Sequence, residues 1–136
     1  MLKRLENLKV ASNTSPLIYL SKIGRLRLLH DLFGAISIPS VVANKILRGK
    51  DLPDGFASAM DVEGAIGTGW IKVEEPDKDE HDLAEIYSRD PGIHPGEAAV
   101  LARGRRFDLL LLDDLCARAF AKALRFSMVT PSSELV

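Results

Sequence analysis

Four consecutive leucines at residues 109–112 run directly into two aspartates, Asp113 and Asp114. An apolar run this short, preceded by polar residues, predicts a strand that is buried on both faces, as in parallel sheets. The two aspartates then follow the carboxyl end of that strand, where open α/β sheets form their ligand-binding crevices. Adjacent carboxylates at this edge can hold a hard cation such as Mg²⁺. Asp114 alone has a simpler interpretation, as the N-cap of a helix that begins at Leu115.

The remaining sequence alternates short apolar segments with longer amphipathic ones. This pattern predicts an α/β fold: a three-layer α/β/α sandwich with a central parallel sheet and right-handed crossovers. Ser15 and Pro16 resemble the N-cap and the first residue of the first helix. The expected strands cover residues 8–12, 35–38, 70–73, 109–112 and 127–130, with 70–73 near a sheet edge, and the expected helices cover residues 16–23, 25–33, 39–49, 56–66, 79–88, 95–103 and 115–124.

The composition suits one globular domain with a substantial core, because the chain has 136 residues and is 46% hydrophobic. We expect a single domain over residues 1–136, with residues 1–7 as an N-terminal extension. The single cysteine, Cys116, favours a reducing, cytoplasmic setting. No apolar run approaches the roughly 20 residues that cross a membrane, and the N-terminus carries no secretion signal. Three histidines and one cysteine argue against a structural zinc site.

Charge is unevenly distributed along the chain. Residues 1–50 contain nine Lys or Arg and two Asp or Glu, whereas residues 51–90 contain three and twelve. Basic clusters can bind the phosphates of a nucleic acid, although each also reads as an ordinary solvated helix face. The acidic stretch at residues 74–85 is interpreted as polar surface and the start of an exposed helix, in preference to a docking site for a basic partner. The basic clusters are Lys22, Arg25 and Arg27; Lys45, Arg48 and Lys50; and Arg103, Arg105 and Arg106.

Polar residues from three separate segments are expected at the same edge of the sheet. The first strand ends at Asn13, Thr14 and Ser15, and the leucine-rich strand ends at the aspartate pair. Glu97 lies in the first turn of the helix that leads into the leucine-rich strand. Each of these residues could instead have a purely structural role, as a helix cap or as a charge that complements a helix dipole. Their agreement on one location favours a metal site.

Four motifs follow one another along the chain: Asn13-Thr14-Ser15-Pro16-Leu17-Ile18, Ile36-Ser37-Ile38-Pro39, Pro95-Gly96-Glu97-Ala98, and the leucine run that ends in Asp113-Asp114. Their order and spacing resemble those of a PIN domain, and within that family they are most similar to the VapC-like toxins of prokaryotic toxin–antitoxin pairs. This resemblance implies Mg²⁺- or Mn²⁺-dependent cleavage of RNA, frequent homodimer formation, and inhibition by a small antitoxin protein. It covers roughly residues 8–130.

The resemblance also implies roles for individual residues. Glu97 and Asp114 would coordinate the cation, with Asn13 as a neutral ligand and Asp113 orienting the attacking water. These four residues form the expected catalytic group. Lys45 and Arg48 would contact RNA phosphates, although Lys45 could equally pair with Glu97 or Asp114 in place of a cation. Thr14 and Ser15 would support the site.

The chain departs from the family pattern at two of its four acidic positions. The first acid is replaced by Asn13, and the second falls at Asn44-Lys45 and is assigned to Lys45. Metal-assisted hydrolysis needs anionic ligands, so we expect at most one well-bound cation and weak or conditional cleavage. The chain also ends six residues after Thr130, so a last element of longer relatives is expected to be missing.

Three classes of function follow from these observations. The first is a metal-dependent endoribonuclease of the toxin type. The second is a catalytically weakened or inactive PIN module that binds RNA or a partner protein. The third is a phosphoacceptor or nucleotide-binding doubly wound domain. The third is disfavoured because receiver domains, which use such an acid pair and lysine, carry the acids after the first strand and the lysine after the last, opposite to the order here. The sequence also has no Gly-rich phosphate loop.

Overall fold

A computed structural model describes residues 8–104, 106–112 and 128–129 of the chain. Its five-stranded sheet has the order β3-β2-β1-β4-β5, and every neighbouring pair is parallel. The elements are β1 (Val10–Ser12), α2 (Thr14–Lys22), α3 (Arg27–Phe33), β2 (Ile36–Ile38), α4 (Ser40–Leu47), the 3₁₀ helix η1 (Arg48–Asp51), α5 (Phe56–Thr68), β3 (Ile71–Val73), α6 (Lys78–Tyr87), α7 (Pro95–Leu101), β4 (Leu109–Leu111) and β5 (Met128–Val129).

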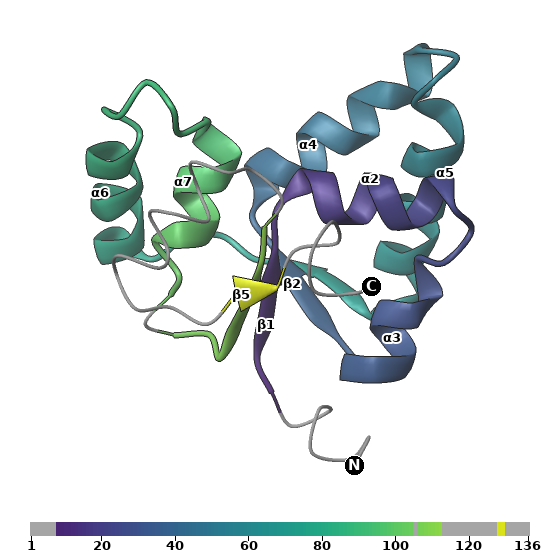
Figure 1. Ribbon diagram of the computed structural model, residues 1–136, viewed down its shortest axis with the longest axis horizontal. Coiled ribbons are helices and arrows are strands. Elements are labelled where there is room, and N and C mark those ends of the chain that lie inside the picture. The colour runs from purple at the N-terminus through teal and green to yellow at the C-terminus, as the bar shows by residue number, and fades with distance from the viewer. Residues whose placement is uncertain (1–7, 105, 113–127, 130–136) are drawn as a thin grey trace.

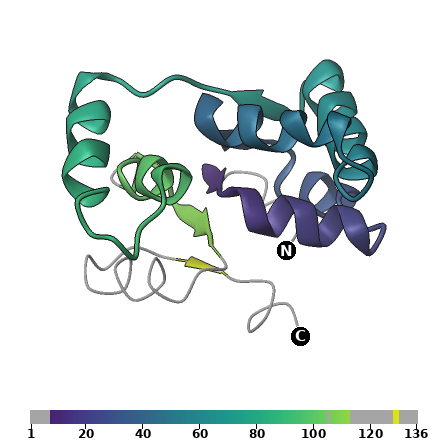
Figure 2. The same cartoon turned by 90° about the horizontal axis from the view of Figure 1, so that it is seen from above.

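Helices cover both faces of the sheet, so the predicted three-layer sandwich is confirmed. Figure 1 shows α2, α3, α4 and α5 on one side of the strands and α6 and α7 on the other. The view from above separates the same two groups of helices (Figure 2). Parallel strands need a crossover between them. The crossovers from β1 to β2 and from β2 to β3 place their helices on one face, and the crossover from β3 back past β2 and β1 to β4 places its helices on the other. Within the described residues, no helix combines the length and the apolar character needed to span a bilayer.

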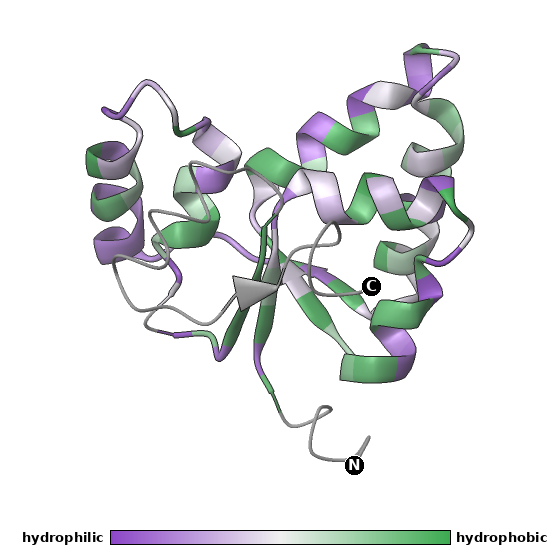
Figure 3. Cartoon of the chain, in the orientation of Figure 1, coloured by the Kyte–Doolittle hydropathy of each residue, from purple (hydrophilic) through white to green (hydrophobic). Residues whose placement is uncertain are grey.

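The central strands are buried on both faces. In β4, for which the leucine run predicted this burial, Leu110 and Leu111 are buried and Leu109 is half-buried. All three residues of β1 and all three of β2 are buried, whereas β3 buries only its first residue and lies at the sheet edge. The hydropathy colouring shows these strands as largely apolar (Figure 3). The core therefore lies where the sheet meets the helices of both layers. Its fully enclosed members include Leu17, Ile38, Val42, Val62, Val100, Leu101, Leu110 and Leu112.

The start of the first helix differs from the prediction. The helix begins at Thr14 with Asn13 as its N-cap, so the assignment of Ser15 as cap and Pro16 as first helical residue was wrong. Proline is tolerated as the third residue for the same reason that it is tolerated as the first, because no N–H of the opening turn has an intrahelical acceptor. The helix predicted at residues 115–124 lies outside the described residues.

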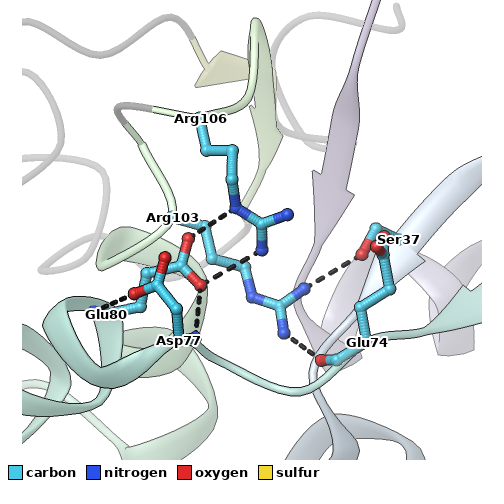
Figure 4. A network of polar contacts seen from close by, with 6 residues as sticks. All are labelled: Ser37, Glu74, Asp77, Glu80, Arg103 and Arg106. Atoms are coloured by element: carbon cyan, nitrogen blue, oxygen red, sulfur yellow. Dashed lines mark hydrogen bonds and ion pairs between the residues drawn. The ribbon is translucent and has the colours of Figure 1, made fainter.

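Two arginines of a basic cluster make hydrogen bonds within the protein (Figure 4): Arg103 is buried, and Arg106 is exposed at the surface. Arg103 is 0% exposed, donates from Nη1 to Ser37 Oγ at 2.9 Å, and also donates to the main-chain oxygen of Glu74. Burial lowers the pKa of its guanidinium. Arg103 therefore joins the end of α7 to β2 and to the segment that follows β3.

The neighbouring arginine is also paired. Arg106 donates to both carboxylate oxygens of Glu80, at 2.7 and 3.1 Å, and this hydrogen bonding raises the pKa of Arg106. Glu80 is 5% exposed and forms a capping box with Asp77 at the start of α6. The interpretation of residues 74–85 as polar surface was therefore wrong for Glu80. Arg105, the third member of the basic cluster, lies outside the described residues.

Candidate active site

Asn13 lies at the carboxyl end of β1, directly beside the end of β4. Its backbone N–H donates to Leu111 O at 3.0 Å, and its carbonyl accepts a hydrogen bond from Ser12 Oγ at 2.9 Å. The parallel pairing of Ser12 with Leu111 sets this register. The residue is 5% exposed. Both strands thus end at one edge, so the sequence-based expectation that their carboxyl ends meet is confirmed.

Glu97 reaches the same edge from the first turn of α7. The helix begins at Pro95, where the missing N–H has no cost, and His94 is the N-cap. Glu97 is 3% exposed, and its Oε1 accepts a hydrogen bond from the His94 N–H at 2.9 Å. A buried carboxylate in this position is favoured by the helix dipole. Its orientation is therefore fixed by local helix chemistry.

Gly96 allows α7 to approach β1 closely. A Cβ added there would lie 3.2 Å from Asn13 Oδ1 and 3.4 Å from Val42 Cγ2. The distance to Asn13 is tighter than ordinary van der Waals contact, so a side chain at this position would press on Asn13. Gly96 belongs to one of the four motifs, but no role was predicted for it. The Pro-Gly pair at the start of the helix is the sequence feature from which this close approach could have been predicted.

Residues from three segments line one pocket of ≈ 220 Å³ at this edge. They come from the β1–α2 junction, from α4 and from the start of α7. Lys45 and His94 are exposed and border the pocket. The lining residues are Asn13, Thr14, Ser15, Lys45, His94, Gly96 and Glu97.

A second hollow adjoins the first through Lys45, which lines both. Its volume is ≈ 420 Å³, and Lys22 and Arg48 contribute further positive charge to it. Arg48 lies in this second hollow and not in the first. A larger pocket of ≈ 500 Å³ lies elsewhere, against residues such as Lys9 and Phe107 that precede strands. Ligands of parallel α/β sheets bind at the opposite, carboxyl end of the strands, which favours the smaller pocket as the candidate active site.

Two described side chains of the pocket carry oxygen atoms of the kind that suits a hard cation. The Glu97 carboxylate and the Asn13 side-chain oxygen are ligands of the kind that Mg²⁺ and Mn²⁺ accept. Within the described residues, no three His, Cys, Asp or Glu side chains lie close enough together to hold a metal ion. Lys45 adds positive charge to the same pocket, which opposes the binding of a second cation. The other predicted ligand, Asp114, lies outside the described residues, as do Asp113 and Cys116.

Comparison with known proteins points to one family. The family model DUF3368, described as a PIN domain, matches residues 9–129. A solved structure with a similar fold is a chain from VapBC2 of Rickettsia felis, in a complex bound to a DNA fragment from its promoter. The two share 12% sequence identity with a TM-score of 0.54, over 90% of this chain and 98% of the other. No curated protein matches the sequence.

Proposed function

This chain belongs to the PIN domain family, and we propose that it is a metal-dependent endoribonuclease of the VapC toxin type with a partly degenerate site. The observation that carries the proposal is the meeting of Asn13, Glu97 and Lys45 in one pocket at the carboxyl edge of the sheet. PIN domains are typically metal-dependent. The basic residues around this pocket favour a phosphodiester substrate, and its assignment to RNA rests on the likeness to VapC toxins.

The proposed metal ligands are Glu97, Asn13 and Asp114, with Asp113 orienting the attacking water. A bound Mg²⁺ or Mn²⁺ supplies water activation and stabilises the leaving oxygen. Glu97 contributes negative charge from a fixed position, because its Oε1 is held by the His94 N–H. Asn13 contributes a neutral oxygen. The resulting site has less negative charge than a set of four acids, which accounts for the weak or conditional activity that we propose.

Substrate contacts are assigned to Lys45 and Arg48. Lys45 lies between the pocket that holds Glu97 and the neighbouring hollow, and Arg48 and Lys22 border that hollow. A strand of RNA that enters the pocket along this path would pass the three cations in turn. Phosphate contacts of this kind position a nucleic acid without reading its sequence. RNA binding should therefore weaken steeply as salt concentration rises.

The proposed setting is the cytoplasm, for which the single cysteine is the argument. The proposed partners are a second copy of the chain and a small antitoxin protein. Both partners are inferred from the likeness to toxins of this family. A short reading frame for a small DNA-binding protein beside the gene would support the antitoxin assignment.

A cleavage assay tests the proposed activity. The full chain is incubated with labelled single-stranded RNA across a range of Mn²⁺ and Mg²⁺ concentrations, with EDTA as the control. We expect slow cleavage that requires the divalent ion and one bound Mn²⁺ per chain by titration calorimetry. Robust cleavage in EDTA would contradict the proposal. Two tight metal sites per chain would contradict the single-cation assignment.

The second candidate function is a PIN module that binds RNA without cutting it. Lys45 favours this alternative, because its ammonium group lies in the pocket at a position where the family pattern has an acid. The same assay separates the two functions. Retained RNA binding with no cleavage at any concentration of either metal would establish the binding module.

Gly96 provides a more local test of the site geometry. In Gly96→Ala the new Cβ would lie 3.2 Å from Asn13 Oδ1 and would displace that ligand by a few tenths of an ångström. We expect cleavage to fall about tenfold, since a shift of 1 Å in a catalytic group can cost on the order of 100-fold. Stability should change by less than about 1 kcal/mol, because alanine is the better helix former.

The matched control is Gly64→Ala in α5. A Cβ at Gly64 has nothing within 4 Å, so this variant gains the same helix preference without touching the site. Cleavage by Gly64→Ala should equal that of the wild type. Equal activity of the two variants would mean that the Gly96–Asn13 contact has no bearing on catalysis.

A further inference from the structure

The N-terminus of α2 opens into the candidate active site. Thr14 and Ser15 are the first two residues of this nine-residue helix, and both line the pocket. Their N–H groups have no intrahelical acceptor, and the third residue, Pro16, has no N–H to offer. The N-cap Asn13 makes no side-chain cap hydrogen bond. The helix therefore presents two backbone donors and its positive dipole end to the pocket.

The hydroxyl of Thr14 is a second, independent sign of a ligand. Thr14 is 5% exposed, and its Oγ1 is shielded from solvent and has no hydrogen-bond partner within the part of the chain that is described. Buried hydroxyls nearly always have a partner, and leaving one unmet is unfavourable. Because Thr14 lines the pocket, a group bound there can accept its hydrogen bond.

Lys45 supplies a full positive charge at the same place. Its side chain is exposed at the pocket, and it takes part in none of the ion pairs found among the described residues. A lysine ammonium is a compact charge with three donors on a flexible stem, which suits a phosphate oxygen. The opposing charge in the pocket is the Glu97 carboxylate, whose Oε1 already accepts the His94 N–H.

We propose that the N–H groups of Thr14 and Ser15, the Thr14 hydroxyl and the Lys45 ammonium form a phosphate-binding site, named here the α2 anion site. Its ligand is a phosphate oxyanion. The assignment of that phosphate to an RNA phosphodiester rests on the proposed function, whereas a free phosphate is the other source of the same chemistry. The α2 anion site binds phosphate with protein donors alone, so binding does not require a divalent cation.

The test uses the full chain in EDTA, where no metal-dependent cleavage takes place. Backbone amide signals are followed by NMR during titration with inorganic phosphate and, separately, with a short single-stranded RNA. We expect saturable shifts of the Thr14 and Ser15 amide signals with both probes. Lys45→Met should weaken each affinity about tenfold, the loss of one charge-assisted contact. Thr14→Val should weaken it about threefold, and Thr14→Ser should restore it.

Lys78→Met is the matched control, because Lys78 is exposed at the start of α6. This variant should bind both probes like the wild type. The proposal is overturned if neither probe shifts the Thr14 and Ser15 amides, or if Lys45→Met loses no more affinity than Lys78→Met. Shifts with phosphate but not with RNA would support the anion site with free phosphate as its ligand and would count against the ribonuclease. Binding of both probes without cleavage under Mn²⁺ would support the site and the RNA-binding module together.

Discussion

Replacing Glu97 with glutamine is expected to lower Mn²⁺-dependent RNA cleavage by at least about a hundredfold. Losing a residue that only hydrogen-bonds to a metal ligand already lowers metal affinity or activity by about 10–100-fold. Glu97 supplies the carboxylate of the described pocket, and a neutral amide is a much poorer ligand for a hard cation. The change is nearly isosteric. The glutamine oxygen can still accept the His94 N–H that Glu97 Oε1 accepts at 2.9 Å. The helix start should therefore survive while the metal affinity falls.

Three measurements make this result specific. The melting temperature of Glu97→Gln should lie within a few degrees of the wild type, which excludes unfolding as the cause. Glu85→Gln should cleave like the wild type, because Glu85 is exposed on α6 and pairs with His81. Phosphate binding in EDTA should persist in Glu97→Gln, since the α2 anion site does not include this carboxylate. Unchanged cleavage by Glu97→Gln would contradict the assignment of this pocket as the active site.

The fold and the edge that carries the candidate site could be predicted because they depend on local pattern. Short apolar runs alternating with amphipathic segments specify a parallel sheet, and parallel strands end at a common edge. The expectation for Asn13 follows from that geometry alone, as Asn13 N–H bonds to Leu111 O across the strand pair. The expectation for Glu97 followed from its position in the first turn of α7. The two aspartates after Leu112 lie outside the described residues, and their roles stay predictions.

The features that escaped prediction depend on contacts between distant segments. Arginines in a run of charges read as surface, because arginine is rarely buried unless paired. Buried Arg103 donates a hydrogen bond to Ser37, which is 66 residues away in the sequence, and Arg106 pairs with Glu80, which is 26 residues away. Composition and periodicity carry no information on such pairings. The contact between Gly96 and Asn13 is of the same kind, since it exists only once α7 is docked against β1.

Arg103→Met is expected to lower the free energy of unfolding by about 2 kcal/mol, through the loss of two hydrogen bonds from a charged donor. The Ser37 hydroxyl and the Glu74 carbonyl would both lose this donor. Two effects reduce the loss. Methionine keeps much of the packing volume, and the substitution removes a buried charge whose Nε has no partner within the described residues. Replacing buried ionic groups with apolar ones is often neutral for that reason, so two lost contacts should outweigh the gain only moderately.

Chemical denaturation of Arg103→Met and of two companions measures this balance. Arg103→Lys keeps the charge but not the planar fork, and one ammonium cannot reproduce both contacts, so its loss should match that of Arg103→Met. Arg89→Met removes an exposed arginine and should change stability by less than about 0.5 kcal/mol. A double-mutant cycle with Ser37→Ala should give a coupling energy of about 1 kcal/mol. Equal or greater stability of Arg103→Met would mean that desolvation outweighs the hydrogen bonds, and that Arg103 does not stabilise the docking of α7 onto the sheet.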